Sequence, residues 1–218
     1  MKYAKELALV FVLVISVLIT QAQKIDKESF AMLNLDYPGL AEIKKTVDHG
    51  KYELGASQLL EYFREKASKN LPDFGAFEET IKLTDGKESA TIAVADSALK
   101  HVFKPNPAYG YYNFGKDIDW TFWPIKDNAF RWQLNRIRWW TDMSLVYYQT
   151  RDERYVREWM AQYLDWAMKN PRRKSADIDR FSWRSLEVSH RIMIQIPMFE
   201  IFINSPNFTP DFLMSFLN

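Results

Sequence analysis

The chain has 218 residues, of which 47% are hydrophobic and 26% charged, a composition that excludes disordered, coiled-coil and collagen-like proteins. Lysine and arginine number 29 against 28 aspartate and glutamate, so a uniformly basic nucleic-acid-binding protein is not expected. Cysteine is absent, which excludes disulfides, thiolate metal sites and a cysteine nucleophile.

The N-terminus has the layout of a secretory signal peptide. Lys2 and Lys5 precede an apolar run over 7–19, and Ala22 places a small residue at the expected cleavage position. We expect residues 1–22 to be removed and the mature chain, 23–218, to be periplasmic. An uncleaved membrane anchor is the alternative. No second apolar run of membrane length follows, so we expect no membrane association after cleavage.

Two helices are predicted next. Pro38 favours the first position of a helix that runs to about residue 47, and Gly50 can end it. Apolar residues spaced three to five apart then predict an amphipathic helix over 51–69.

The segment 70–127 is rich in proline, glycine and aromatic residues. We expect a long ordered loop there, because loops of this length are usually functional or disordered and the aromatic residues favour order. Only 88–103 has a helical pattern within it.

From residue 128 onward the sequence predicts long helices joined by short loops. The expected elements are a single helix over 129–149, a second capped by Asp152 and stopped by Asn170-Pro171, a polar loop over 171–180, a third over 183–203 bent at Pro197, and a fourth that begins at Thr209-Pro210. Strand alternation of useful length is not found, so the fold class is all-α, built from antiparallel helical hairpins. Because the fourth helix is short when the sequence stops, we expect a truncated helical array.

Charge and aromatic residues concentrate in the same stretch. Residues 131–191 hold 13 Lys or Arg, 11 of them Arg, against 8 Asp or Glu, and all eight Trp lie between 120 and 183. Flat aromatic faces suit sugar rings, and the planar guanidinium matches sulfate and carboxylate groups. This combination indicates a groove for an acidic polysaccharide. The alternative is that Trp fills the seams between helices while Arg covers their outer faces.

The most specific local pattern lies in 183–191. Trp183, Glu187 and Arg191 are spaced so that they fall on one helical face. Glu187 precedes Arg191 by four residues, the favourable order for an ion pair. The pair is either a surface salt bridge or part of a cleft wall.

Four segments together resemble the N-terminal domain of the heparinase II/III family: FGKDIDW (114–120), WQLNR (132–136), FSWRSLEVS (181–189) and NSPNFTP (204–210). The resemblance follows the family order over about 40–218. It implies the N-terminal part of an incomplete α/α toroid, normally followed by an antiparallel β-sandwich domain. It also implies a periplasmic lyase that cleaves uronate-containing polysaccharides by β-elimination, closest to the enzymes that act on heparan sulfate.

The resemblance places the family's catalytic Asn, Tyr and His beyond residue 218. We therefore assign no catalytic residue, leave His101 and His190 unassigned, and expect no turnover from this chain alone. No metal or cofactor is expected, and the partner is an anionic polysaccharide similar to heparan sulfate. The residues predicted to bind it are Trp120, Trp123, Asn135, Arg136, Trp183, Arg184, Glu187 and Arg191.

Other functions stay open at this point. A non-catalytic helical module that binds acidic glycans would need only the Trp and Arg set. A glycoside hydrolase would need two carboxylates about 5–10 Å apart, for which Asp142, Asp165 and Glu187 are available. A purely structural helical domain is also possible.

Overall fold

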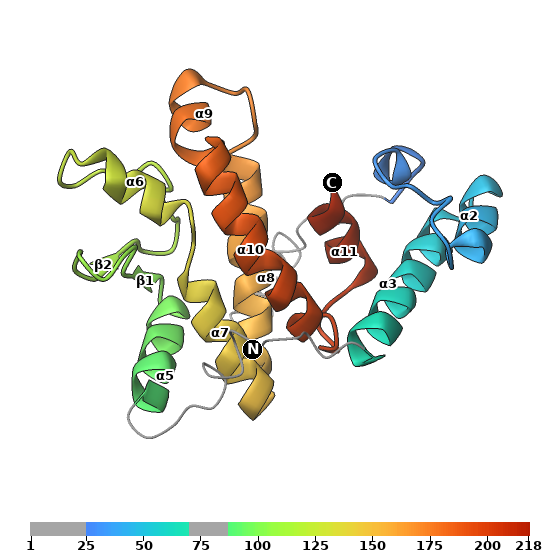
Figure 1. Cartoon of the computed structure of the whole chain (residues 1–218), viewed down its shortest axis with the longest axis horizontal. Helices are drawn as coiled ribbons and strands as arrows, with labels where there is room; N and C mark the ends of the chain where they lie inside the picture. Colours follow the sequence, from blue (N-terminus) through green and yellow to red (C-terminus); the bar gives the residue numbers. More distant parts are fainter. Residues whose placement is uncertain (1–24, 70–86) are drawn as a thin grey trace, which may run out of the picture. The chain divides into compact units, whose positions relative to one another are not determined.

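Figure 1 shows the computed structural model, which describes residues 25–69 and 87–218. The predicted signal peptide and part of the predicted loop, 70–86, lie outside the described residues. The chain is mostly helical, as the sequence predicts. It divides into two compact units, one containing residues up to Leu59 together with Pro210–Asn218, and the other containing Leu60–Thr209.

The first unit holds the 3-10 helix η1 (Glu28–Phe30), α2 (Ala41–Asp48), the start of α3 (Tyr52–Lys69) and α11 (Pro210–Leu217). Helices α2 and α3 approach closely, because a Cβ atom on Gly55 would lie 2.7 Å from the Val47 side chain. The amphipathic helix predicted over 51–69 is confirmed as α3, and the fourth C-terminal helix as α11.

The first predicted helix begins later than expected. Gly39, next to Pro38, has a φ of 94°, which is outside the helical region, so α2 starts only at Ala41. Gly50 follows its C-terminal end with a φ of 73°, a conformation that glycine adopts at no steric cost.

The second unit contains the remaining elements: α5 (Lys87–Ala98), β1 (Val102–Phe103), β2 (Tyr112–Asn113), α6 (Asn128–Leu134), α7 (Trp139–Thr150), α8 (Glu153–Lys169), α9 (Ala176–Ser182) and α10 (Ser185–Phe202). Helix α7 lies at its centre and packs against α5, α8 and α10 (Figure 1). The interior is filled with large aromatic side chains, including the fully buried Trp140 and Trp159.

The helix predicted over 88–103 ends at Ala98, so the prediction is wrong for its last turn. His101 takes a φ of 54°, and the chain then forms β1, which pairs antiparallel with β2 by placing Phe103 opposite Tyr112. The Phe103 ring stacks on Trp139 at a centroid distance of 4.2 Å. Burial of this ring therefore outweighs continuation of the helix.

The single helix predicted over 129–149 is also wrong, because residues 135–138 separate α6 from α7. Asn135 caps α6, and its Nδ2 donates to the carbonyl oxygen of Arg131 at 2.9 Å. Ile137 has a φ of 54° and is fully buried. A left-handed residue cannot continue a helix, so the chain changes direction there.

The loop predicted over 171–180 contains the start of α9, because the Ser175 hydroxyl caps this short helix by accepting from the Ile178 N–H at 3.1 Å. Helix α10 begins at Ser185 and not at Trp183, and it contains Pro197. By contrast, α8 has the predicted cap at Asp152 and the predicted end at Asn170.

Gln162 connects four groups in the interior of the second unit and is 1% exposed. Its Oε1 accepts from the indole N–H groups of Trp139 at 3.0 Å and Trp140 at 2.8 Å. Its Nε2 donates to the Ala98 carbonyl oxygen at 3.1 Å and to Glu158 at 2.9 Å. Both lone pairs and both amide protons are thereby used.

Candidate functional site

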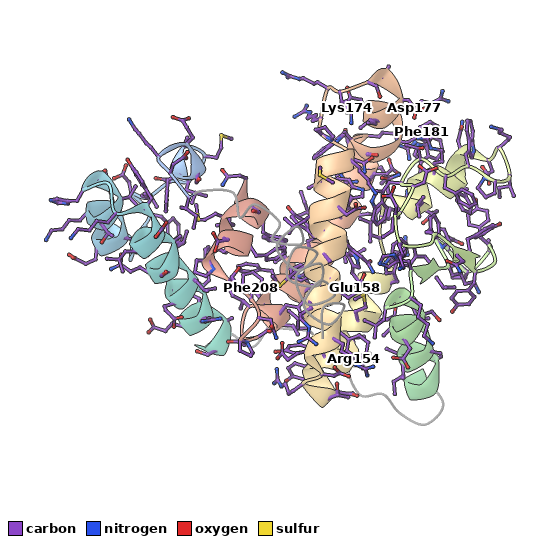
Figure 2. The ribbon with its side chains drawn as sticks, turned by 180° about the vertical axis from the view of Figure 1, so that it is seen from behind. Arg154, Glu158, Lys174, Asp177, Phe181 and Phe208 are labelled. Atoms are coloured by element: carbon purple, nitrogen blue, oxygen red, sulfur yellow. The ribbon has the colours of Figure 1, made fainter. Side chains whose placement is uncertain are left out.

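Cationic and aromatic side chains gather where α6, the turn 135–138, α9 and the start of α10 meet. Figure 2 labels Asp177 and Phe181 on α9, which follows the C-terminal end of α8. Arg154 and Glu158, also labelled there, lie in the N-terminal half of α8. The loop before α6 contributes Trp123. All these residues belong to the second unit.

Two arginines at this site lie over aromatic rings. The guanidinium carbon of Arg131 lies 3.9 Å from the centre of the Phe181 ring and 5.6 Å from that of Trp123. That of Arg184 lies 3.9 Å from the centre of Trp132, whose ring is 6.1 Å from Phe181. We refer to Arg184, Trp132, Phe181, Arg131 and Trp123 as the cation–ring stack.

Arg131 is anchored within this stack. It is 4% exposed, and its two terminal nitrogens donate to the two carboxylate oxygens of Asp177 at 2.8 and 2.7 Å. The bond holds the pKa of Asp177 below its usual value, although partial burial of the carboxyl opposes this. A bidentate pair fixes the orientation of the guanidinium plane, so α6 and α9 are held in one geometry.

Glu187 is fully buried and pairs with two arginines. Its Oε1 accepts from Arg136 at 3.0 Å and from Arg184 at 2.8 Å, and its Oε2 accepts from Arg184 at 2.6 Å. Burial opposes ionisation of Glu187, but the bonds from Arg184 and Arg136 outweigh it and hold its pKa below the usual value. The carboxylate therefore orients the guanidinium of Arg184 through hydrogen bonds at its edge, and the Trp132 ring contacts one face of the same guanidinium.

The predicted pairing of Glu187 with Arg191 is wrong. Arg191 donates instead to the carbonyl oxygen of Asn135 at 3.1 Å, and its guanidinium carbon lies 4.4 Å from the ring centre of Trp166 and 5.2 Å from that of Trp183. Burial lowers its pKa to about 10, although the Glu187 charge acts in the opposite direction. Trp183 lies before α10, so the predicted shared helical face does not form.

Five of the eight predicted binding residues are buried: Arg136, Glu187 and Arg191 within the ion-pair and ring contacts described above, and Asn135 and Trp120 in the interior. Asn135 is fully buried, and its Oδ1 accepts from Trp166 at 3.0 Å and from Ser182 at 2.9 Å. Trp120 is 2% exposed, stacks with Phe103 and Trp139, and donates from its indole nitrogen to Asp165 at 2.8 Å. Both residues occupy core positions, and a sugar ring has no access to the Trp120 face.

Trp123 and Trp183 are half-buried at the edge of this site. The Trp123 indole donates to the Asp127 carbonyl oxygen at 2.9 Å, and Lys126 lies 4.7 Å from its ring centre. The Trp183 indole donates to the Asn170 carbonyl oxygen at 2.7 Å. Each ring is held by its polar end, which leaves part of its apolar face accessible.

Sequence reasoning missed Arg131, Trp132 and Phe181 as members of the site. Trp132 and Phe181 both lie inside segments that carry the family resemblance, which was the available signal. Their contact joins residues 49 positions apart, and helical periodicity within one segment cannot reveal such a contact.

Two other kinds of site are absent from the parts of the chain that the structure describes. Over 25–69 and 87–218, His, Asp and Glu side chains do not gather in a group of three that could hold a metal ion. Within the same ranges, each helix is too short or too polar to span a bilayer.

Comparison with known proteins gives one consistent result. The family model of the heparinase II/III N-terminus matches residues 29–218. The heparin-sulfate lyase of Pedobacter heparinus is 48% identical over 201 residues, and that of Bacteroides stercoris is 41% identical over 213 residues. These alignments cover 92% and 90% of this chain but only 30% and 31% of the relatives.

Solved structures agree with the sequence comparison. The crystal structure of the Pedobacter heparinus heparan sulfate lyase superposes with a TM-score of 0.83 at 49% identity, covering 89% of this chain and 30% of that one. A crystal structure of heparinase III gives a TM-score of 0.74 at 31% identity, over 89% and 30% of the two chains. This chain therefore spans about 30% of the length of the relatives it matches.

Proposed function

The chain belongs to the heparinase II/III family, and from this premise we propose that it is part of a polysaccharide lyase that acts on heparan sulfate or a similar uronate polymer. Its helices form the N-terminal part of an α/α toroid. Its relatives support the substrate, since each of them is a heparin-sulfate or heparan sulfate lyase. In this proposal the present residues line part of the substrate groove.

The observation that carries the groove assignment is the preorganised state of Arg184. Its Nε and one Nη2 proton bind Glu187, its face lies on Trp132, and 39% of its side chain is exposed. Guanidinium has five N–H donors, so the outward ones are free to bind a sulfate or carboxylate. Because the orientation is already fixed, little entropy is lost when an anion binds.

The half-buried rings of Trp123 and Trp132 complete the arrangement. Each has a cation close to its face and a polar edge that is already hydrogen bonded. An acidic sugar presents both an apolar ring face and charged substituents, so it can contact a Trp face and an Arg fork together. A neutral sugar would use only the rings.

Glu187 has a positioning role in this proposal. A general base must reach the proton it removes, whereas the Glu187 oxygens are fully buried and already accept from Arg136 and Arg184. An ionised carboxylate facing a uronate would also repel it. Glu187 therefore keeps Arg184 in place, and no catalytic role is assigned to it.

The binding test compares Arg184→Ala with Arg157→Ala, an exposed arginine in the N-terminal half of α8 that gives the same change in charge. Arg184→Ala should weaken heparan sulfate binding about tenfold, the effect of losing a charge-assisted bond. Arg157→Ala should bind heparan sulfate as tightly as the wild type does, and higher salt should weaken binding by the wild type. Equal binding by both variants would contradict the groove assignment.

The chemical test uses the digest of heparan sulfate made by the whole gene product. β-Elimination leaves an unsaturated uronate that absorbs ultraviolet light, whereas hydrolysis adds water and leaves a saturated end. A glycan-binding module, the alternative function, would bind the polymer and release no unsaturated product. Mass spectrometry of the fragments distinguishes these three outcomes.

Export is a further part of the proposal. A basic start, an apolar run and Ala22 support a cleaved signal peptide over 1–22 and a periplasmic protein. N-terminal sequencing of the protein from periplasmic extract should begin near Gln23. Retention of Met1 in the cytoplasmic fraction would contradict it.

A further inference from the structure

The turn between α6 and α7 lies against the start of α10. Arg191 donates to the Asn135 carbonyl oxygen at 3.1 Å, and Arg136 donates to Glu187 at 3.0 Å. These contacts hold the turn beside the α10 segment that includes His190. Arg138, two residues after Arg136, is exposed at the end of this turn.

Positive charge exceeds negative charge at this contact. Arg136 and Arg184 share the one carboxylate of Glu187, and both of its oxygens are occupied. In the part of the chain that the structure describes, no ion pair is formed by Arg138. The Nε of Arg136 is buried and has no hydrogen-bond partner among the described residues.

Repulsion between these cations contributes, after burial, to the titration of the neighbouring groups. His190 has a lowered pKa because of partial burial and then the charges of Arg136 and Arg138, which outweigh the opposing effect of Glu187. The pKa of Arg138 is lowered as well, first because part of its otherwise exposed side chain is covered and then through repulsion by Arg136. An anion placed beside these groups would offset the repulsion between them and favour the charged form of each.

We infer that Arg138 and His190, with Arg136 behind them, form a subsite for one oxyanion, a sulfate or carboxylate group of the polysaccharide. The subsite rests on the proposed function and adds residues outside the cation–ring stack. Helix α7, 12 residues long, begins immediately after Arg138, so its N-terminal dipole adds positive potential at the same place. Protonated His190 donates to the anion, and Arg138 contributes a fork of N–H groups.

The experiment follows the His190 ring signals by NMR in the full chain. The chain has two other histidines, His49 and His101. The signal that disappears in His190→Gln is therefore assigned to His190. The pKa of His190 is measured in sodium sulfate and in sodium chloride at equal ionic strength. Sulfate should raise it, and a rise of one unit corresponds to tenfold tighter binding of sulfate to the protonated form.

Arg138→Gln should abolish this rise, and Arg157→Gln should leave it unchanged. Because Arg138 is exposed, the variant is expected to keep the melting temperature of the wild type. An equal rise in Arg138→Gln, or no rise in the wild type over the whole sulfate titration, would overturn the subsite.

Two oligosaccharides distinguish the source of the oxyanion. Heparan sulfate fragments carry sulfate and carboxylate groups, whereas unsulfated N-acetylheparosan fragments carry only carboxylates. A rise of the His190 pKa with both assigns a uronate carboxylate, and a rise with the sulfated fragment alone assigns a sulfate. If neither raises it while the sulfated fragment still binds, the subsite fails and the proposed function stands. If inorganic sulfate raises it but the wild type binds no polysaccharide, the proposed function fails.

Discussion

Arg131 lies with its guanidinium carbon 3.9 Å from the centre of the Phe181 ring, and this contact joins α6 to α9 across 50 residues of sequence. Both terminal nitrogens of this guanidinium donate to Asp177, so the nearly buried cation has partners on its face and at one edge, whereas its buried Nε has no hydrogen-bond partner among the described residues. These contacts of Arg131 make the short helix α9 part of the site.

Arg131→Lys should destabilise the protein by about 1–3 kcal/mol, because an ammonium cannot form the bidentate pair or stack flat on Phe181. Thermal unfolding measures the effect, with Arg180→Lys as the control, since Arg180 is exposed on the same helix as Phe181. If the two variants melted together, the anchoring role of Arg131 would be refuted.

Stability should fall as the pH rises through the pKa of His101. Its Nε2 lies 2.8 Å from Glu158 and its Nδ1 lies 2.6 Å from the Gly115 carbonyl oxygen, so both nitrogens face acceptors and the imidazolium is required. The bond to Glu158 raises the pKa above 6.5, against the effect of burial. This contribution is therefore fully present below about pH 6.5 and is lost above the folded-state pKa.

Chemical unfolding of the wild type and His101→Gln over this pH range measures that contribution as a difference. The glutamine side chain does not titrate, so the stability of the His101→Gln variant should lack this pH dependence. Because the pKa of His190 is lowered, its contribution to stability rises with pH. Both proteins contain His190, so this contribution cancels in the difference. Parallel pH curves for the two proteins would show that folding does not raise the pKa of His101.

Asp142→Asn should stabilise the protein at alkaline pH. Burial raises the pKa of Asp142 from 3.8 to about 7, so the folded state retains a proton that the unfolded state has released. The free energy of unfolding of the wild type therefore decreases by an amount on the order of 4 kcal/mol as the pH rises from about 4 to 7. The variant should melt higher than the wild type at about pH 8 and close to it at about pH 4. A lower melting temperature at both pH values would mean that the ionised carboxylate has a partner in the fold.

Trp120 and Trp123 should respond differently to truncation although only two residues separate them. Trp120→Ala removes a buried ring and should cost about 3–5 kcal/mol of stability. Trp123→Ala should leave most of the stability and weaken heparan sulfate binding. Thermal unfolding and affinity measurements on both variants decide the matter, and a Trp120 variant that folds normally but fails to bind would reverse the assignment.

Local signals in the sequence predicted the elements whose ends depend on neighbouring residues. Asp152 caps α8 by accepting from the N–H of Arg154, two residues later, and Pro210 begins α11. The break at 135–138 could not be predicted, because Asn135 is held by Trp166 and Ser182, which are 31 and 47 residues away. Helical periodicity describes one segment at a time, whereas this turn is selected by partners on other helices.

The candidate site, like the fold, could be predicted only in part. The resemblance selected segments that do meet in space, and Arg184 and Glu187 are both among the predicted binding residues, although Glu187 pairs with Arg184 and not with Arg191. Which Trp faces remain accessible depends on long-range packing, such as the stacking of Phe103 on Trp139 that also encloses Trp120. Composition shows that aromatic residues are abundant, but it cannot distinguish a ring in the core from a ring at the edge.

The fully used amide of Gln162 determines how this position can vary. Leucine or methionine would leave the indole N–H groups of Trp139 and Trp140 without an acceptor, and glutamate would lose both donors and place a second carboxylate beside Glu158. In a library that carries all twenty residues at position 162, selection for folded protein should return glutamine almost alone. Adjacent exposed positions on α8, such as Ala161 and Leu164, should accept many side chains.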